Sequence, residues 1–557
     1  MASTALEEER YVRSELQNKG VRRQIMNGVV PFIVVVTVST AAFLYFFTNR
    51  MTNVYGDGVA HVNIARKVVD SADDSLRQRY IQIGSPWLPV QTVLMLPLVT
   101  NDWMWRTGAA GSIVSMIAFI IAALVLHRLA IRLYRGEDCG FDRGDDENAE
   151  VPRMIKALPS LSLAIFLFNP SILYLQATPM SELVFMAALI LAVHLLQCWR
   201  DDQTTVRLSL AAIAMSGATL TRYEAWPVAL LSVLIVALAA NGAWKSKLRP
   251  TLTFGALVLV GPLYWMWHNW EIYGNALEFL SGPNSARGIA FQNRVNFNWS
   301  SIFVGHAGLD FLTMSAATSV CAGPVVFLLG AAGFVTLLIR KRKSLLEYSP
   351  LVLLVLPFLF EVFGLYRGEI QINPISAFGL LNVRYGLPHL LAVALFAPAT
   401  LLLFRVQLRR TAAIVCSIVV VAQYLYLISE GPAQLAIYQE GLRNGVNARV
   451  AKERSRVASF VRTNPPARLI LMHTGSLGPL VSQGGLYFAD TIHEGTGRWH
   501  QLEDGIPGDV MTVIVQAGDP LDLRIQHEAI LSRDLSSDFT PQFSVGNISV
   551  YGRIRTR

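Results

Sequence analysis

A carboxylate between two glycines, Asp57, follows the first long apolar segment of the chain. Glycine on either side permits a tight turn, and we expect such a turn to aim the Asp57 carboxylate along an adjacent surface. A carboxylate held there can act as the general base that deprotonates or orients a hydroxyl group. An isolated Gly-Asp-Gly run favours the alternative, a solvated turn residue with no chemistry.

Two arginines, Arg222 and Arg384, lie at the ends of long apolar segments, on the side that carries Asp57. An ionised side chain near hydrocarbon is costly unless it is paired, so each arginine needs a partner. A planar guanidinium can hold a phosphate with two parallel hydrogen bonds, which is the functional interpretation. The alternatives are extension of the side chain to the membrane surface, or an ion pair with Glu224, Glu361 or Glu369.

Further polar residues accompany these three. Glu182 opens another apolar segment on the same side, where the dipole of a helix N-terminus would stabilise its carboxylate. Binding of an acceptor or of a divalent cation by Glu182 is the weaker alternative. A divalent cation is the one cofactor that these residues suggest, and the sequence does not identify its ligands. The candidates for substrate binding are Arg222, Arg384, Glu182, Glu224, His61 and Tyr385.

The elements that must position these residues are apolar segments. Hydrophobic residues make up 53% of the 557 positions and charged residues 15%, so the chain has more apolar surface than a soluble fold usually buries. The apolar residues fall in separate windows of roughly 20 residues, the length that an α-helix needs to cross a bilayer. We therefore predict an all-α polytopic membrane protein with about eleven transmembrane helices. The predicted runs are 25–47, 108–129, 157–175, 180–199, 208–221, 226–240, 251–268, 316–339, 349–366, 386–404 and 412–428, and a further run at 89–99 is too short to cross.

Basic residues cluster in alternate short connections between these segments, as the positive-inside rule expects of cytoplasmic loops. The net charge of +8 therefore reflects membrane topology, and we expect no nucleic acid partner. Residues 1–24 are predicted to be cytoplasmic, and an odd number of spans places the C-terminus outside. The clusters are Arg200 with Arg207, Lys245 with Lys247 and Arg249, residues 340–343, and Arg405 with Arg409 and Arg410.

The first outer loop, residues 48–106, contains an amphipathic helix after the Gly-Asp-Gly run. Val62 and Ala65 lie on one side of this helix, which we expect in the plane of the membrane interface. Arg66 precedes Asp70 by four residues, the spacing of an exposed ion pair that contributes little to stability.

Two other segments lie outside the membrane. The acidic connection at 136–150 has the composition of a disordered linker and carries no assigned chemistry. The tail at 430–557, after a transmembrane region at 25–429, is predicted to be a small extracytoplasmic α/β domain. Its expected elements are a helix at 448–461, strands at 468–473, 510–516 and 542–551, and turns around Gly475 and at Gly484-Gly485.

The chain resembles the GT-C glycosyltransferases, and within them the protein O-mannosyltransferase and aminoarabinose-transferase (family 39-like) branch. The resemblance covers residues 25–430 and rests on the architecture, the acidic start of the first outer loop, and the segments TRYEAW at 221–226 and NVRYG at 382–386. In that family an acidic residue early in the first outer loop lies at the catalytic centre, and the matching position is Asp57. The protein mannosyltransferases have adjacent Asp-Glu there, whereas this chain has Asp57-Gly58.

The resemblance implies an inverting transfer of one hexose or pentose from a polyprenyl-phosphate carrier to a lipid, glycan or protein acceptor. Asp57 would be the base, while Arg222 and Arg384 would stabilise charge on the departing phosphate. It also implies a multi-pass protein of the cell (inner) membrane with its active site outside the cytoplasm. Two other classes stay open. A lipid or sugar transporter should carry charges near the middle of several spans, and a non-catalytic membrane scaffold does not need the three residues to converge.

Overall fold

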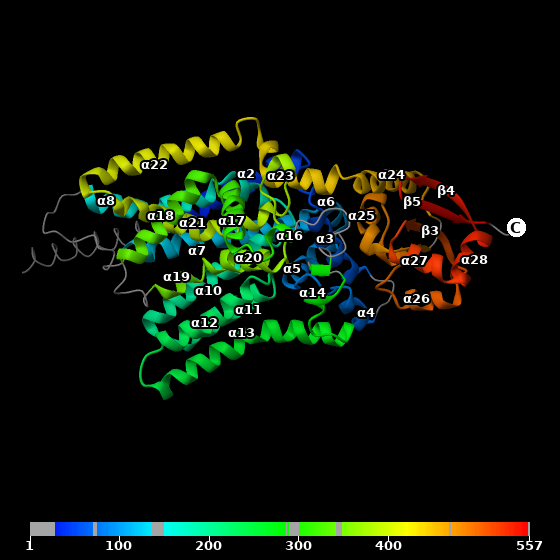
Figure 1. Ribbon diagram of the computed structural model, residues 1–557, viewed down its shortest axis with the longest axis horizontal. Coiled ribbons are helices and arrows are strands. Elements are labelled where there is room, and N and C mark those ends of the chain that lie inside the picture. Colours follow the sequence, from blue (N-terminus) through cyan, green and yellow to red (C-terminus); the bar gives the residue numbers. More distant parts are fainter. Residues whose placement is uncertain are drawn as a thin grey trace, which may run out of the picture.

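The computed structural model is an elongated molecule with a helical bundle and a smaller domain that contains the C-terminal strands (Figure 1). It describes residues 28–70, 75–135, 150–283, 285, 287–288, 300–340, 348–466 and 469–554. The predicted cytoplasmic N-terminus, nearly all of the predicted linker at 136–150 and the basic residues 341–343 lie outside the described residues.

Seven of the described helical segments are long and apolar enough to cross a membrane. Each coincides with a predicted run, so the chain is a polytopic membrane protein with a mainly α-helical fold. The segments are α2 (Val30–Thr48), α7 (Ala109–Arg135), α10 (Glu182–Asp202), α13 (Trp244–Tyr273), α19 with α20 (Ser349–Val352 and Leu356–Arg367), η5 with α21 and η6 (Val383–Gly386, Leu390–Phe396 and Ala397–Leu403), and α22 (Val406–Leu427).

The run at 316–339, which was expected to form one span, is broken. Helices α17 (Ala307–Ala322) and α18 (Pro324–Arg340) meet at an angle of 116° around Gly323. Gly323 has a φ of +89°, which glycine tolerates, and Pro324 has no backbone N–H with which to continue the hydrogen-bond ladder of α17. Hydropathy does not detect this break, because the residues on both sides of it are mostly apolar.

Three further runs form helices shorter than a full crossing. Helices α11 (Thr205–Thr219) and α12 (Ala225–Ala239) have 15 residues each, and each therefore spans about 22 Å of the roughly 30 Å of hydrocarbon. The run at 157–175 is divided between α8 (Glu150–Leu167) and α9 (Pro170–Leu175). Among the described residues, seven helices, or eight with the bent pair, have crossing length, and the predicted count of about eleven stays a prediction.

The connections that carry basic residues lie away from the C-terminal domain. Figure 1 places the connection between α12 and α13, and the start of α22, at the far end of the bundle. The Gln203 side chain after α10 donates to the carbonyl of Ala239 in α12 at 3.4 Å, so these two connections are neighbours. The Arg340 side chain in α18 donates to the carbonyl of Leu402 in η6 at 2.6 Å. The connections with basic residues thus lie at one end of the bundle, as positive-inside topology requires. The assignment of this end to the cytoplasm stays a prediction.

The first outer loop folds into four short helices, with α5 too short to cross a membrane, as expected. The expectation that the helix after Asp57 lies in the interface plane stays a prediction, and the structure shows what this helix packs against. Helix α3 packs against α5 and α7 on one side and against α25 (Thr474–Gly484) of the C-terminal domain on the other. Val62 and Ala65 are both buried in these contacts. The helices are α3 (Gly56–Val69), α4 (Leu76–Ile81), α5 (Val90–Val99) and α6 (Asp102–Thr107).

The C-terminal domain is the predicted small α/β domain, built on one five-stranded sheet in the order β2-β1-β3-β5-β4. Strand β1 is parallel to β2 and β3, whereas β5 is antiparallel to β3 and β4. Besides α25, its elements are α24 (Arg449–Thr463), β1 (Leu469–Met472), β2 (Thr491–Ile492), α26 (Gly497–His500), β3 (Val510–Gln516), α27 (Pro520–His527), α28 (Ala529–Asp538), β4 (Phe539–Val545) and β5 (Ile548–Arg553). In the bundle, α14 (Glu278–Ser281) and α16 (Ser300–Phe303) are single turns.

Two expectations for this domain are corrected. The strand expected at 542–551 is the hairpin of β4 and β5, which turns at Gly546 with a φ of +56°. Gly475 lies inside α25 and not in a turn, because the His473 ring accepts a hydrogen bond from the backbone N–H of Ser476 (3.2 Å) and caps that helix. The turn at 484–485 is confirmed, since α25 ends at Gly484 and Gly485 has a φ of +79°.

Candidate active site

Asp57 lies in the first turn of α3, at the end of the bundle that meets the C-terminal domain. The expected tight turn is wrong, because the helix already begins at Gly56 and neither adjacent glycine has a positive φ. Gly58 permits a close approach instead, since a Cβ atom there would lie 2.9 Å from Pro179 and 3.3 Å from Met180. The positive end of the helix dipole favours a carboxylate at this position, and 45% of the Asp57 side chain is exposed.

Glu182 joins the two arginines. Its Oε1 accepts hydrogen bonds from Nη1 of Arg384 at 2.7 Å and from Nη1 of Arg222 at 3.1 Å. Nη2 of Arg384 also contacts Oδ2 of Asp57, so the four side chains form one continuous series of ion pairs. Glu182 is fully buried as the first residue of α10, where its carboxylate is also stabilised by the dipole of that helix, as expected.

Glu224 is the second partner of Arg222. Its Oε1 accepts a hydrogen bond from Nε at 2.7 Å and lies 2.6 Å from Nη2. Of the three expected acidic partners, Glu224 is confirmed, and Glu369 is wrong because it pairs with Arg367 at 3.6 Å. Within the described residues, Glu361 is buried in α20 and forms no ion pair. Both site arginines are buried, which excludes extension to the membrane surface.

Tyr385 and His61 lie around these ion pairs. The ring centre of Tyr385 lies 4.9 Å from Cζ of Arg222 and 5.2 Å from Cζ of Arg384, so the ring contacts both guanidiniums. The His61 ring lies against Trp87, with ring centres 4.6 Å apart. Burial lowers the pKa of His61 to about 4, so the ring is neutral near pH 7. His61 can therefore donate or accept a hydrogen bond but does not add a positive charge.

All seven predicted site residues thus come together, from α3, α10, η5 and the connection between α11 and α12. Three carboxylates in the ion pairs face only two guanidiniums. Asp57 is the most exposed member, so an incoming molecule reaches the contact between Asp57 and Arg384 first. Over the part of the chain that the structure describes, no three His, Cys, Asp or Glu side chains are grouped to hold a metal ion.

Two neighbours of the site were missed in the sequence. Glu440, in α23 (Ala436–Gly441), accepts hydrogen bonds from the backbone N–H groups of Asn382 and Val383, directly before Arg384. The Tyr55 hydroxyl donates to the carbonyl of Ile437 in the same helix. Glu440 follows the last predicted span in a polar tail, where no pattern distinguishes it from other acidic residues.

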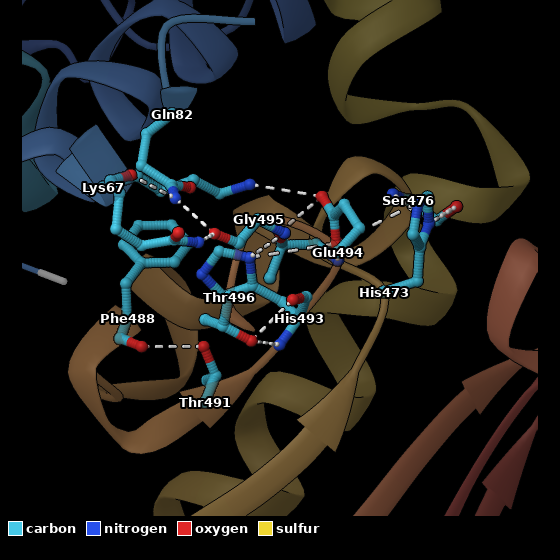
Figure 2. Close-up of polar contacts among 12 residues, drawn as sticks. Lys67, Gln82, His473, Ser476, Phe488, Thr491, His493, Glu494, Gly495 and Thr496 are labelled. Carbon is cyan, nitrogen blue, oxygen red and sulfur yellow. Dashed lines mark hydrogen bonds and ion pairs between the residues drawn. The ribbon is translucent and has the colours of Figure 1, made fainter. Parts of the chain in front are cut away.

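A polar junction joins the first outer loop to the C-terminal domain (Figure 2). Nζ of Lys67 lies 3.3 Å from Oε1 of Glu494, whose carboxylate also accepts hydrogen bonds from the backbone N–H and the hydroxyl of Thr474. The Gln82 side chain donates to the carbonyl of Gly495 at 2.6 Å. Burial opposes ionisation of Glu494. The charge of Lys67, the nearby histidines and the hydrogen bond from Thr474 together outweigh burial, so the pKa of Glu494 is well below its usual value.

The expected pair of Arg66 and Asp70 is confirmed at 3.3 Å, but it is not exposed. Asp70 also accepts a hydrogen bond from the backbone N–H of Phe488 at 3.0 Å, and Cζ of Arg66 lies 4.5 Å from the ring centre of Trp105. Asp70 therefore helps to hold the loop against the C-terminal domain. Asp102 is 44% exposed and lies 2.8 Å from Arg66. In exposure and in its pairing with an arginine, Asp102 is therefore more similar to Asp57 than Asp70 is.

The fold and these residues define a polytopic membrane protein whose buried ion pairs end in one exposed carboxylate, next to a mixed α/β domain. Neither a protein-family model nor a curated protein matches the sequence. Solved structures are similar to it at low identity. ArnT from Cupriavidus metallidurans bound to undecaprenyl phosphate is 12% identical, with a TM-score of 0.49 over 94% of this chain and 98% of that chain. The Archaeoglobus fulgidus oligosaccharyltransferase in the apo form is 11% identical, with a TM-score of 0.44 over 93% of this chain and 74% of that chain.

Proposed function

We propose that the protein is a membrane glycosyltransferase that moves one sugar from a polyprenyl-phosphate carrier to an acceptor hydroxyl, with inversion. The contact between Asp57 and Arg384, next to the pair of Glu182 and Arg222, is the observation that carries this proposal. It brings a carboxylate that can take a proton close to two guanidiniums that can hold a phosphate. Sugar transfer from a phosphate carrier requires these groups, and the resemblance of the sequence to GT-C enzymes favours the same reaction.

In the proposed reaction, the acceptor oxygen forms a bond to the anomeric carbon from the face opposite the phosphate. The bond between that carbon and the phosphate oxygen breaks, and the polyprenyl phosphate leaves with the electron pair. Asp57 takes the proton of the acceptor hydroxyl, and Arg384 and Arg222 stabilise the negative charge that develops on the departing phosphate. Since a phosphate leaves readily, one base suffices, in contrast to the paired carboxylates of a glycosidase.

The carrier phosphate has to share Arg384 with Asp57. Glu182 is fully buried whereas Asp57 is 45% exposed, so an arriving phosphate competes with Asp57 for Arg384 and not with Glu182. A phosphate bound to Arg384 would release the Asp57 carboxylate, which could then accept the proton of the acceptor. Donor binding would therefore come before activation of the acceptor.

The other candidate residues would orient these groups. Glu182 and Glu224 fix the two guanidiniums, and the Tyr385 ring contacts both. Nδ1 of His61 is buried and has no hydrogen-bond partner among the described residues, so a sugar hydroxyl that enters the site can become its partner. The reaction written in this way requires no cofactor.

We place the protein in the cell (inner) membrane with this site outside the cytoplasm. The site and the C-terminal domain share one end of the bundle, and the basic connections lie away from it (Figure 1). The acceptor would be a lipid, glycan or protein on the outer side. A scaffold would not need Asp57, Arg222 and Arg384 to meet, and a transporter would need its charges nearer the middle of the spans.

A lipid-extract assay tests this function. Membranes from cells that lack the protein, cells with the natural protein and cells with Asp57→Asn are compared for their polyprenyl-phosphate-linked sugars. One lipid-linked sugar should accumulate without the protein and also with Asp57→Asn at a normal protein level. An unchanged lipid pool in both cases would contradict the enzyme proposal. Accumulation without the protein but not with Asp57→Asn would assign the role of base to another residue.

A further inference from the structure

We infer that residues 436–446 form a clamp that fixes the backbone segment of Asp57 in position relative to that of Arg384 for sugar transfer. The clamp consists of α23 and the π-helical turn η8 (Leu442–Val446), and Glu440 lies near its centre. Glu440 is then a positioning residue of the reaction, since it contacts backbone and not the reacting groups. The inference rests on the proposed function, because the relative position of Asp57 and Arg384 affects the rate only if both act in the reaction.

At the Arg384 end, both oxygens of the Glu440 carboxylate are used. Oε1 accepts the backbone N–H of Asn382 at 2.9 Å, and Oε2 accepts that of Val383 at 2.8 Å. Asn382 has a φ of +52°, a left-handed conformation that asparagine adopts more readily than most residues with a side chain. Because Arg384 follows directly, these two bonds set the direction in which its side chain leaves the backbone.

At the other end, the clamp contacts the residues just before α3. The Tyr55 hydroxyl donates to the carbonyl of Ile437. Gly441 lies against the side chains of Val54 and Tyr55, and a side chain at Gly445 would collide with the carbonyl oxygen of Val54. Glycines at these two positions therefore allow the clamp to approach the backbone that leads into the first turn of α3.

The geometry at Glu440 suits a carboxylate. In the observed geometry each of the two backbone N–H groups donates to a different oxygen of the carboxylate. A glutamine has one acceptor oxygen and an amide nitrogen, which cannot accept a bond from the second N–H group. Glu440 is 3% exposed, so water cannot replace the lost bond readily. Burial raises the pKa of Glu440, whereas the charge of Arg384 and the two backbone N–H groups favour its ionised form.

Two substitutions break the clamp at opposite ends, Glu440→Gln and Gly445→Ala. Each should lower kcat roughly tenfold, about the effect of one hydrogen bond to a charged group, while the KM for the lipid donor changes less. The matched controls are Glu503→Gln, at an exposed residue, and Gly497→Ala, where a Cβ atom meets nothing within 4 Å. Both controls should transfer sugar as the natural protein does. If Gly445→Ala does not fold, Gly441→Ala replaces it with a milder collision.

Hydrogen exchange tests, without relying on activity, whether the clamp holds both backbone segments. Peptides covering 53–60 and 380–386 should both exchange faster in each clamp variant, although each change touches only one of them. Faster exchange in one peptide alone would show two independent contacts and overturn the clamp. Faster exchange in both with an unchanged kcat would overturn the positioning role of Glu440. If the natural protein transfers no sugar, the proposed function fails and the positioning role with it, whereas the exchange data still decide whether the clamp exists.

Discussion

Arg384 and Glu182 are 202 residues apart in the sequence, yet Nη1 of one lies 2.7 Å from Oε1 of the other in a buried ion pair. Glu182 also holds Arg222, so removal of any of the three takes a partner from at least one buried charge, and breaking a buried ion pair typically costs about 3 to 5 kcal/mol. Asp57 is different, because nearly half of its side chain is exposed. Substitution of Asp57 therefore separates chemistry from folding better than substitution of Glu182.

Asp57→Asn tests the base. Asparagine preserves the size of the side chain and removes its negative charge, so we expect normal insertion, retained donor binding, and sugar transfer slower by at least about a hundredfold. The transfer rate at saturating donor measures this. Asp102→Asn is the matched control, because Asp102 also lies in the first turn of a helix of the outer loop, is 44% exposed and pairs with an arginine. Equal losses in the two variants would remove Asp57 from the catalytic role.

Arg384→Lys tests the phosphate contact. Arg384 reaches Glu182 and Asp57 through different nitrogens, an arrangement that one ammonium group cannot reproduce. We expect the KM for the lipid donor to rise at least roughly tenfold, which corresponds to the free energy of about one hydrogen bond to a charged group. Arg222→Lys should also raise this KM. Arg498→Lys is the control, since it loses a two-pronged contact with Asp509 far from the reaction. Unchanged donor use by a folded Arg384→Lys protein would make this arginine structural.

Two buried histidines predict how stability depends on pH. Burial lowers the pKa of His493 to about 3 and that of His61 to about 4, against about 6.5 in an unfolded chain. Between about pH 6.5 and 4, the unfolded chain therefore binds protons that the folded protein does not. The free energy of unfolding should fall as the pH falls through this window, by up to about 1.4 kcal/mol per pH unit for each histidine.

The unfolding temperature measured from pH 7.5 down to about pH 5 tests this slope, in a range where the carboxylates of the unfolded chain stay largely ionised. The variant His493→Asn can still accept the backbone N–H of Gly495, which lies 3.1 Å from Nδ1 of His493. We expect the pH dependence to be weaker in this variant. A slope as steep as that of the natural protein would show that His493 does not contribute.

Thiol labelling tests which end of the bundle lies outside the cell. In a protein whose four native cysteines are replaced, Ser532→Cys in α28 and Lys245→Cys in α13 each present one exposed thiol. An impermeant maleimide added to intact cells should label the Ser532→Cys protein, and the Lys245→Cys protein only after the membrane is opened. The reverse pattern would place Asp57 on the cytoplasmic side and contradict an outer acceptor.

The sequence predicts where the helices lie better than how they cross the membrane. Apolar runs mark burial in lipid or protein alike, so the runs that form the short helices α11 and α12 do not show whether these helices cross the membrane. In the C-terminal domain, the strand expected at 510–516 coincides with β3, because this mostly apolar and β-branched run lies at the sheet centre. Strands β4 and β5 were merged because only the turn at 546–547 separates them.

The residues of the candidate site could be named from the sequence, but their arrangement could not. Arg222 and Arg384 stand out because a charge at the end of an apolar segment is costly without a partner. Which carboxylate meets which arginine depends on contacts between segments that lie hundreds of residues apart, and Glu369 was a wrong choice for this reason. Glu440 gives no local signal at all, since it becomes distinctive only when the fold brings it to Asn382.

Helix α22 is only slightly buried by the rest of the protein, as expected of a helix that lies mostly against lipid. Its 22 residues give a length of about 33 Å, and the chain then continues through residues 428–435 into the clamp that carries Glu440. In a bilayer thinner than its apolar length, a helix tilts to relieve the hydrophobic mismatch. Such a tilt would move the start of the clamp, so turnover in vesicles of increasing acyl-chain length should pass through a maximum, and Glu440→Gln should weaken this dependence. The thickness of the surrounding bilayer then becomes one of the variables that set the rate of sugar transfer.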